Sequence, residues 1–396
     1  MKRYWTLAAV LDASPAAAQT VTVEAGANAQ ERLQAALIEA KAGSIVRIGA
    51  GRFELTDGLS LDVDRVTVRG AGPDKTVLSF KGQLGAGEGL LVTSDDVVLR
   101  GFAVEDSKGD GIKSKGADRI VYKDIRVEWT GGPKATNGAY GVYPVESSDV
   151  LIDGVTVKGA SDAGIYVGQS DRIIVRNSIA THNVAGIEIE NSGHADVTGN
   201  LVTHNTGGIL VFDLPALPRR GAGWVTVSDN KVVDNDTPNF APKGNIVATV
   251  PTGTGVLIMA ANNVTVTGNE LAGHGTANIM VIAYRQPFDD KGYNPLPRHV
   301  HLAANKHGRA GFAPAMPGGA ELAKALGGTL PPIFWDGTGG DAVALTGDNQ
   351  VPVLSLGLAL GAGIETAKPQ PVKLREEIPP PLGIVKLPPA MEAAAK

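Results

Sequence analysis

The sequence of 396 residues contains no cysteine and no long apolar run. Without cysteine, neither disulfide bonds nor a cysteine-based zinc site can hold the chain together. Without about 20 consecutive apolar residues, no membrane-spanning helix is expected. The 41 acidic residues outnumber the 36 basic ones, which argues against a nucleic-acid partner because such binding surfaces are basic. Phosphate-binding loops and nucleophile elbows are also missing from the sequence. The fold must therefore depend on its own apolar core.

A repeat of 22 residues dominates what is present. Gly164, Gly186 and Gly208 follow this period, and apolar residues alternate after each of them. Alternation at every second residue is typical of a strand with one buried face. The same frame begins further strands at other lead residues: Gly89, Gly111, Gly141, Gly255 and Asn278. Short strands repeated in this way stack into a solenoid.

A second strand recurs within each coil, followed by a residue suited to a tight turn. These turn residues are Gly154, Asn200, Asn230, Asn269 and Asn305. Glycine and asparagine tolerate left-handed backbone dihedrals, so we expect them at the corner of the coil. The pattern predicts an all-β fold, a single-stranded right-handed parallel β-helix. Its inward files should contain the alternating residues Ile165, Val167, Ile187, Ile189, Ile209 and Val211.

The two ends of the chain depart from the repeat. Residues 29–41 place leucines and alanines on one face at helical spacing, which predicts an N-terminal capping helix for the open end of the solenoid. We predict that residues 20–310 form the β-helix with this cap. Residues 311–396 are expected to form a covering segment, with a short helix near 319–328 and a proline-rich tail.

Residues 1–19 have the order of a secretory signal. Lys2 and Arg3 precede a short apolar run, and Ala16 to Ala18 form a small-residue cleavage site before Gln19. Asp12 interrupts the run, and a disordered start of a cytosolic protein is the alternative. The order favours export, which predicts a periplasmic or secreted protein.

Stacked coils turn equal positions into columns, and two columns of the lead strands face outward. The first column contains Leu91, Lys113, Tyr143, Tyr166, Glu188, Leu210, Leu257 and Met280. The second contains Thr93, Lys115, Val145, Gly168, Glu190, Phe212, Met259 and Ile282. We expect the early coils to present a polar, solvent-facing floor between the loops 129–139 and 234–254. The apolar late coils require a cover, which the insertions can provide.

The polar floor suits a sugar polymer, because aromatic faces pack on pyranose rings while charged groups bind hydroxyls or carboxylates. We predict four catalytic candidates: Glu188, Glu190, Tyr166 and Lys113. We predict five substrate-binding candidates on the floor and on the loops 213–223 and 284–298: Tyr143, Lys115, Asp213, Arg219 and Arg285. Ordinary solvated strand residues and an aromatic ladder are the structural alternative.

Two chemistries fit the catalytic candidates. Glu188 and Glu190 share one strand face about 7 Å apart, as the acid and base of a glycosidase can be. Lys113 and Tyr166 can instead neutralise charge and act as the base in an elimination or epimerisation at a uronic acid. Replacing such solvent-facing residues is expected to cost about 0.5 kcal/mol or less in stability.

His182 and His204 are expected to be neighbours across one rung. A pair of imidazoles suggests a metal site, but no third ligand follows in the column. Hydrogen bonding at a stacked corner explains them more simply. We therefore predict no metal site, and the sequence requires no cofactor.

Several strings resemble an exported bacterial family of parallel β-helix repeat proteins in the pectin-lyase-like group. They include NGAYGVYPVESSDV, GASDAGIYVGQS, NVAGIEIENS, NTGGILVFDLP and NTPNFAPKGNIVATVPTGTGV, and the resemblance covers roughly residues 28–310. It implies the fold and a signal segment but no established activity, and it suggests an exported cytochrome-like protein as a partner. More distant members of the group are polysaccharide lyases, hydrolases and uronate epimerases. The Asp-Pro-His-Asp signature of alginate epimerases is absent here.

Two functions follow as hypotheses. The first is an exported protein that binds and modifies a polysaccharide, as a lyase or related uronate-active enzyme. The second is a non-catalytic carbohydrate-binding or assembly protein of the cell envelope. The polar floor favours the first hypothesis, and the covered apolar half with its proline-rich tail favours the second.

Overall fold

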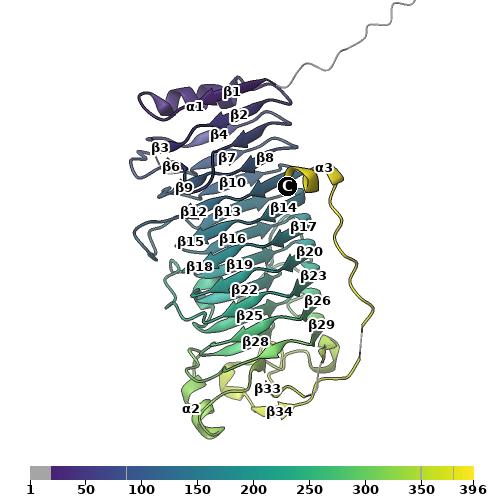
Figure 1. Ribbon diagram of the computed structural model, residues 1–396. Coiled ribbons are helices and arrows are strands. Elements are labelled where there is room, and N and C mark those ends of the chain that lie inside the picture. Colours follow the sequence, from purple (N-terminus) through teal and green to yellow (C-terminus); the bar gives the residue numbers. More distant parts are fainter. Residues whose placement is uncertain (1–18, 86, 348–349, 378) are drawn as a thin grey trace, which may run out of the picture.

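Each coil contributes one short strand to each of three parallel sheets, and the stacked coils form a right-handed parallel β-helix (Figure 1). The computed structural model describes residues 19–85, 87–347, 350–377 and 379–396. The segment 1–18, on which the export prediction depends, lies outside these residues. The predicted fold class is confirmed.

The strands are as follows, in stacking order. Sheet A contains β1 (Thr20–Val23), β2 (Ile45–Ile48), β5 (Thr67–Arg69), β8 (Val98–Arg100), β11 (Ile120–Lys123), β14 (Ser148–Asp153), β17 (Asp171–Arg176), β20 (Gly193–Thr198), β23 (Gly223–Ser228), β26 (Asn262–Thr267), β29 (Arg298–Ala303) and β32 (Thr346–Gly347). Sheet B contains β3 (Gly51–Glu54), β6 (Thr76–Ser79), β9 (Ala103–Glu105), β12 (Arg126–Glu128), β15 (Thr156–Lys158), β18 (Ile179–Thr181), β21 (Leu201–Thr203), β24 (Lys231–Val233), β27 (Glu270–Ala272) and β30 (Lys306–His307). Sheet C contains β4 (Leu59–Leu61), β7 (Leu90–Val92), β10 (Ile112–Lys115), β13 (Tyr140–Val145), β16 (Ala163–Gly168), β19 (Ala185–Glu190), β22 (Gly207–Phe212), β25 (Thr254–Met259), β28 (Ala277–Ile282), β31 (Ile333–Trp335), β33 (Val353–Ser355) and β34 (Gln370–Val372).

The helices lie outside the sheets. They are α1 (Ala29–Ile38), α2 (Gly319–Ala325) and α3 (Pro389–Ala394), with the 3₁₀ turns η1 (Ile246–Thr249), η2 (Gly340–Val343) and η3 (Ile364–Thr366). Among the described residues, no helix has both the length and the apolarity needed to cross a bilayer.

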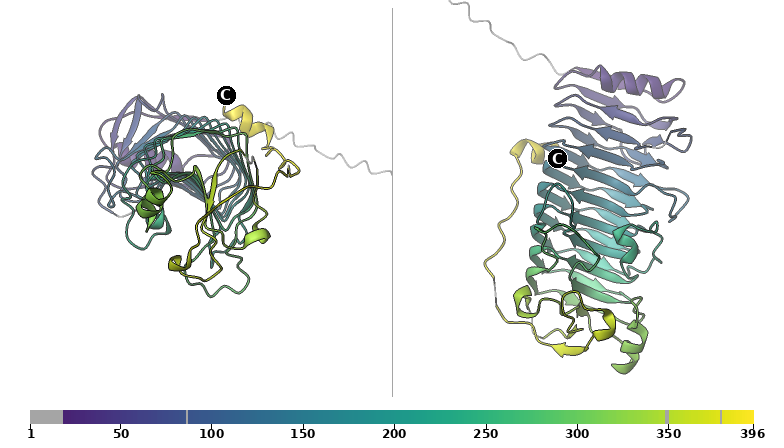
Figure 2. Two further views of the ribbon diagram at one scale, coloured as in Figure 1. Left: turned by 90° about the horizontal axis from the view of Figure 1, so that it is seen from below. Right: turned by 180° about the vertical axis from the view of Figure 1, so that it is seen from behind.

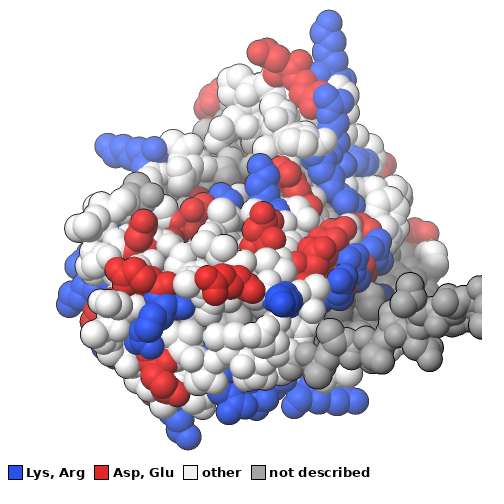
Figure 3. Space-filling view, turned by 90° about the horizontal axis from the view of Figure 1, so that it is seen from above, with Lys and Arg blue, Asp and Glu red and all other residues white. Residues whose placement is uncertain are grey.

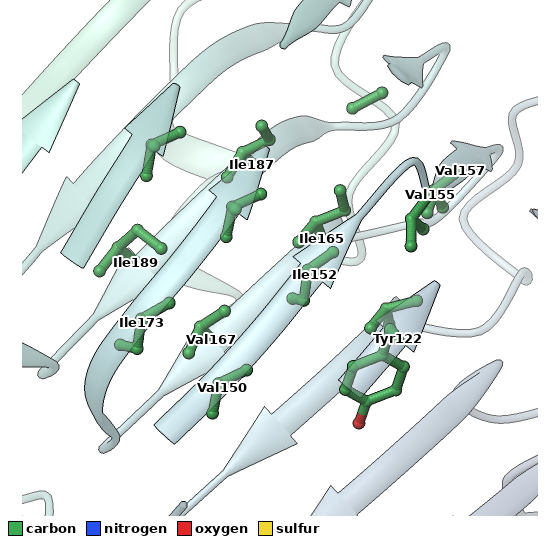
Figure 4. Packing of buried hydrophobic residues seen from close by; sticks show 14 of the residues in the cluster. Tyr122, Val150, Ile152, Val155, Val157, Ile165, Val167, Ile173, Ile187 and Ile189 are labelled. Carbon is green, nitrogen blue, oxygen red and sulfur yellow. The ribbon is translucent and has the colours of Figure 1, made fainter. Parts of the chain in front are cut away.

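The 22-residue register is confirmed by the pairing of the lead strands in sheet C. Ile165 pairs with Ile187, and Ile187 pairs with Ile209. All three side chains are fully buried. Figure 4 shows Ile165 and Ile187 on neighbouring strands inside the solenoid. Adjacent files from sheets A and B complete a continuous apolar core. Stacked β-branched residues fill such a core well because their side chains have few rotamers to lose.

The asparagines predicted at the left-handed corner have a different role. The left-handed residues are Gly154, as expected, and then the residues just before the asparagines, such as Gly199 (φ 66°) and Asp229 (φ 55°). Asn200 is instead buried, and its amide donates to Val175 O at 3.0 Å and to Asn230 Oδ1 at 2.9 Å. The predicted left-handed position was therefore one residue too late. The asparagine side chain hydrogen-bonds to the neighbouring coils, and the left-handed backbone belongs to the residue before it.

A second asparagine column lies under the lead glycines. Asn205 Nδ2 donates to Ala180 O at 2.9 Å and to Asn235 Oδ1 at 3.0 Å. A Cβ atom at Gly186 would lie only 2.9 Å from Asn205 Nδ2. The same Cβ atom would also clash with Val202 Cγ1 and lie 2.7 Å from Gly208 O, so the core valine, the next coil and the asparagine column together leave no room for a side chain at Gly186.

Helix α1 closes the N-terminal end and buries Leu33 and Leu37 against the first coils. It ends at Ile38, three residues before the predicted end. The outer surface of this end carries charges of both signs, interspersed (Figure 3). A polar cap of this kind keeps the open end of a solenoid from associating with other molecules.

The C-terminal residues first extend the sheets and then fold back. Strands β31 and β33 continue sheet C, and β34 pairs antiparallel with β33. Residues 379–396, here called the strap, run back along sheet A (Figure 1). Leu387 and Met391 of the strap pack on Leu151 and Ile174 of sheet A. Loops and short helices gather on the C-terminal half of the solenoid (Figure 2).

The asparagine column gives a stability prediction. Asn205→Ala removes buried hydrogen bonds to both neighbouring coils and leaves their partners unsatisfied, so we expect the free energy of unfolding to fall by about 3 kcal/mol. Urea denaturation measures this change, with the exposed Asn294→Ala as the control. A loss no greater than that of the control would contradict a structural role for the column.

Candidate functional site

The two outward columns of sheet C have the predicted register. Lys113 pairs with Tyr143, Tyr166 with Glu188, and Glu188 with Leu210. In the second column Gly168 pairs with Glu190, which pairs with Phe212. The columns therefore bring Lys113, Tyr143, Tyr166, Glu188 and Glu190 together on neighbouring rungs.

The expected solvent-facing floor is wrong for three of these residues. Tyr166, Glu188 and Glu190 keep only 3%, 1% and 7% of their surface exposed. The insertion 234–254 lies on them rather than beside them, because Val247 and Val250 pack in one apolar cluster with Tyr166 and Leu210. Their replacement is consequently a change in a buried cluster, and it is not expected to leave stability unaltered.

The apolar outward residues of the late coils are covered as predicted. Phe212, Leu257 and Met280 are buried in the same cluster as Tyr284 and Leu356, which come from later segments of the chain. The cover removes from water an apolar strip that would otherwise be costly to expose. The C-terminal half of sheet C is thus largely covered, and a cavity of about 320 Å³ lined by Met280, Phe334 and Leu356 remains beneath the cover.

Three tyrosines form the boundary between exposed and buried parts of the site. The ring centroids of Tyr140 and Tyr166 are 4.4 Å apart, and those of Tyr143 and Tyr166 are 4.9 Å apart with an edge-to-face angle of 85°. Such contacts hold aromatic rings in fixed orientations. Tyr140 and Tyr143 are half-buried, so they are the part of the cluster that a ligand can reach.

Lys113 lies at the exposed side of the tyrosines. Its Nζ is 4.9 Å from the ring centroid of Tyr143, 3.2 Å from Glu88 Oε1 and 3.9 Å from Asp110 Oδ2. These groups are partly exposed, and they combine a cation, an aromatic face and two carboxyl groups. We call Glu88, Asp110, Lys113 and Tyr143 the outer set.

Carboxyl groups crowd the buried side of the tyrosines, and we call Asp162, Tyr166, Glu188 and Glu190 the inner set. Burial raises the pKa of Asp162 to about 7 and that of Glu190 to about 7, and the negative charges of neighbouring acids add to the rise. Burial also raises the pKa of Asp110 to about 6. Perturbed acids of this kind are typical of functional sites, although structural networks also produce them.

Glu188 is the most unusual member of the inner set. Neither carboxyl oxygen has a hydrogen-bond partner among the described residues. Burial, followed by the charges of Asp162 and Glu190, raises its pKa well above the ordinary value. An ionised carboxylate without partners is very costly to bury, so Glu188 keeps its proton.

Tyr166 cannot act as the predicted base. Burial, followed by the charge of Glu190, raises the pKa of its hydroxyl far above the usual value, so the phenol keeps its proton. The hydroxyl donates to Glu190 Oε1 at 2.6 Å. Its ring lies over Gly168, whose missing side chain leaves the space through which the hydroxyl reaches Glu190. Lys113 contacts the ring of Tyr143, and with Tyr166 buried the two residues cannot share the roles predicted for them at a uronic acid.

Of the other predicted binding residues, Lys115 and Asp213 lie near this site, whereas Arg219 and Arg285 lie apart from it. Lys115 is exposed on β10, two residues beyond Lys113. Asp213 is buried and accepts hydrogen bonds from the backbone of Gly221 and Ala222. Arg219 pairs with Asp171 of sheet A at 2.8 Å. Arg285 donates to Thr338 Oγ1 at 3.2 Å and to the carbonyl of Ala362.

His182 and His204 are neighbours as predicted, with ring centroids 5.4 Å apart. His204 Nδ1 lies 3.0 Å from Asp236 Oδ1, and His182 Nδ1 lies 2.8 Å from Thr181 Oγ1. Over the described part of the chain, no three His, Cys, Asp or Glu side chains converge on a point where a metal ion could bind.

Sequence reasoning missed Asp110, Tyr140 and Asp162. Asp110 and Asp162 come just before β10 and β16, on the turns that lead into sheet C, and Tyr140 is the first residue of β13. Asp110 and Tyr140 directly precede the lead glycines Gly111 and Gly141, so the repeat frame itself contained a signal for two of them. Asp162 accepts a hydrogen bond from Asn245 of the insertion at 2.9 Å, a contact that no local pattern shows.

Comparison with known proteins gives one family and several structures. A family model described as a right handed beta helix region matches residues 61–219 and 136–286. The A-module of the mannuronan C-5 epimerase AlgE4 from Azotobacter vinelandii has a TM-score of 0.53 and 14% identity, covering 86% of this chain and 97% of its own. The A-module of AlgE6 from the same organism has a TM-score of 0.52 and 14% identity, covering 82% and 91%. At these identities the likeness concerns the fold alone. No match is found among curated protein sequences.

The inner set gives a pH prediction. An acid whose pKa is raised by folding stabilises the folded state fully below its unfolded pKa of about 4, and this contribution is lost as the pH rises through the folded pKa. The folded pKa values near 7 for Asp162 and Glu190 predict that stability falls as the pH rises from about 4 to about 7. Glu188→Gln removes one ionisable group whose pKa is raised by folding, so the loss of stability between pH 5 and pH 8 should be smaller in this variant than in the parent.

Urea unfolding at the two pH values tests this prediction. The exposed Glu270→Gln is the matched control, and it should follow the parent protein at both pH values. An identical pH dependence in Glu188→Gln and the parent would show that Glu188 is not a protonated acid in the folded state.

Proposed function

The chain belongs to the right-handed β-helix family, and we propose that the outer face of its sheet C binds a polysaccharide over β10 and β13. The mannuronan epimerase modules of the same fold act, by their names, on a polysaccharide. That likeness concerns the fold, so the proposal depends on the side chains of this chain.

The observation that carries the proposal is the outer set. Lys113 stands beside the ring of Tyr143, with its Nζ 4.9 Å from the ring centroid, and both side chains are partly exposed. A pyranose ring can pack on the tyrosine while the ammonium group binds a sugar hydroxyl or a uronate carboxylate. The strands hold both groups rigidly, which lowers the entropy cost of binding.

The outer set can also transfer protons, which supports a uronate-active enzyme. Lys113 would neutralise the uronate carboxylate, and Asp110, with a pKa of about 6, is ionised at neutral pH and can accept the proton on C5. In an elimination, the electrons of that C–H bond form the C4–C5 double bond while the C4–O bond breaks. Tyr143, whose pKa is raised by burial to about 12, keeps a proton that it can give to the leaving oxygen. In an epimerisation, C5 would instead regain a proton on the opposite face.

A non-catalytic carbohydrate-binding protein is the second candidate. The burial of Tyr166, Glu188 and Glu190 favours it, because three of the four residues predicted to be catalytic cannot contact a polymer on the surface. In that case the inner set would only position Tyr143 and Tyr140 from behind. Both candidates share the binding surface and differ in whether the bound polymer changes.

Export would place the protein where polysaccharides are found. We expect the mature chain to begin near Gln19, in the periplasm or the medium. Mass spectrometry of the protein from its natural host checks this, and an intact Met1 in the cytosolic fraction would contradict it. The exported cytochrome-like partner also stays a prediction, which depends on the family resemblance alone.

The binding surface is tested with the double variant Lys113→Ala, Tyr143→Ala. Affinity electrophoresis in gels that contain alginate, polygalacturonate or a neutral glucan identifies a bound polymer, and ultraviolet absorbance of an unsaturated product reports elimination. Because the variant removes the cation and the aromatic face together, we expect binding of the polymer to weaken by about tenfold or more. Any turnover should be lost with it.

Lys231→Ala, an exposed lysine of sheet B, is the matched control. Unaltered binding in the double variant, with a polymer that the parent recognises, would remove this face of sheet C from consideration. Binding that is lost in the double variant, without a product from the parent at any pH, would establish the second candidate.

A further inference from the structure

A cleft of 450 Å³ lies between the strap and the outer face of sheet A. On the sheet side it is lined by Trp224, Asn263, Thr265 and His299, and on the other side by Pro379 to Pro381 of the strap. Figure 1 shows the strap passing outside β29, β26, β23 and β20 before α3 docks. We call this feature the strap cleft. It is on a different sheet from the candidate site on sheet C.

Trp224 is the exceptional residue of the strap cleft. It is 46% exposed, whereas Trp129 is buried in the core. Its backbone is left-handed, with φ 54°. Because the indole is about half exposed, its burial contributes little to the stability of the folded chain. Its backbone also occupies a region of φ/ψ space that disfavours bulky side chains.

Neighbouring coils also have a left-handed residue at this corner of sheet A, and tryptophan is unusual among them. The left-handed residues at equal places in sheet A are Arg172, His194, Trp224, Asn263 and His299. Asparagine and histidine are enriched in this conformation, and tryptophan is not. A residue that strains the backbone and stays exposed points to a role beyond folding.

The indole ring is supported from the preceding coil. The ring of His194 stacks on it at a centroid distance of 5.5 Å and an angle of 21°. His194 Nδ1 lies 2.9 Å from Asp171 Oδ1, and Arg219 holds the same oxygen at 2.8 Å. This chain of contacts fixes the platform in place before any ligand arrives, which lowers the entropy cost of binding.

The remaining lining defines the ligand. Asn263, Thr265 and His299 offer neutral hydrogen-bond donors and acceptors around the aromatic platform, and Glu377 adds an acceptor. Among the described residues that line the cleft there is no lysine or arginine, so phosphate and nucleic acid lack a counter-charge from them. An acyl chain would leave the polar groups unpaired, which is costly. We propose that the strap cleft is a saccharide-binding subsite in which a pyranose ring packs on Trp224. The proposal rests on the proposed function only for the class of ligand, since the two sites share no residue.

Trp224→Asn is the sharpest test, because Asn263 already occupies the equivalent place in the next coil. The full chain is titrated with a mannuronate hexamer, a galacturonate hexamer and cellohexaose while tryptophan fluorescence is recorded. Isothermal titration calorimetry measures the affinity of the Trp224 variants, because these variants lack the fluorophore of the cleft. We expect at least one of the three to change the fluorescence of the parent. In Trp224→Asn the affinity should fall by about tenfold or more, while the melting temperature stays equal or rises because the strained residue is gone.

Trp224→Phe keeps an aromatic face and should retain part of the affinity. The proposal is overturned if none of the hexamers changes the fluorescence of the parent. It is also overturned if Trp224→Asn binds the responsive hexamer as tightly as the parent, or if Trp224→Asn and Trp224→Phe lose stability alike without losing affinity.

The double variant Lys113→Ala, Tyr143→Ala separates this subsite from the site on sheet C. Fluorescence changes that persist in the double variant, together with calorimetric binding that is lost in Trp224→Asn, support the strap cleft whatever happens on sheet C. Polymer binding that is lost in the double variant but unchanged in Trp224→Asn leaves the proposed function standing and removes the subsite.

Discussion

The register between successive coils is the constraint on which the rest of the structure depends. Each coil hydrogen-bonds to the next through its backbone, so every side chain stands between the residues at the same place in the adjacent coils. Inward this produces files of isoleucine and valine, at the corner it produces the asparagine columns, and outward it places Glu188 between Tyr166 and Leu210. A slip of one residue would turn the inward isoleucines outward. The lead glycines and asparagines that fix the register therefore also fix the geometry of the site.

The same constraint explains why acids remain buried on sheet C. The register holds Glu188 in place, and η1 covers it, so its carboxyl group cannot turn toward water. Moving an isolated carboxylate out of water costs far more than moving a neutral acid, and the group responds with a raised pKa. The inner set thus holds protonated acids next to the partly exposed side chains of Lys113 and Tyr143. The inner set also lowers the free energy of unfolding at neutral and alkaline pH.

Sequence reasoning succeeded where a feature is local and failed where it depends on distant segments. The alternation after Gly164, Gly186 and Gly208 was sufficient to predict the register and both outward columns, because strand periodicity depends on neighbouring residues only. Facing outward from a strand is not the same as being exposed, however. The burial of Tyr166 depends on how residues 234–254 fold back over it, and the contact between Asn245 and Asp162 joins residues far apart in the chain. Exposure therefore could not be derived from the period.

Two places in the chain break the local rules that the rest obeys, and they break them in opposite ways. Sheet C buries acids that belong in water, whereas sheet A exposes a strained tryptophan that belongs in the core. Sequences that are otherwise consistent tend to break such rules at functional sites. Because coils of a solenoid contact only their neighbours, a change at Trp224 on β23 has no direct route to Lys113 on β10 or Tyr143 on β13, which lie in earlier, non-adjacent coils. We therefore expect the two sites to contribute independently to the binding of a long polymer, with additive rather than allosteric effects.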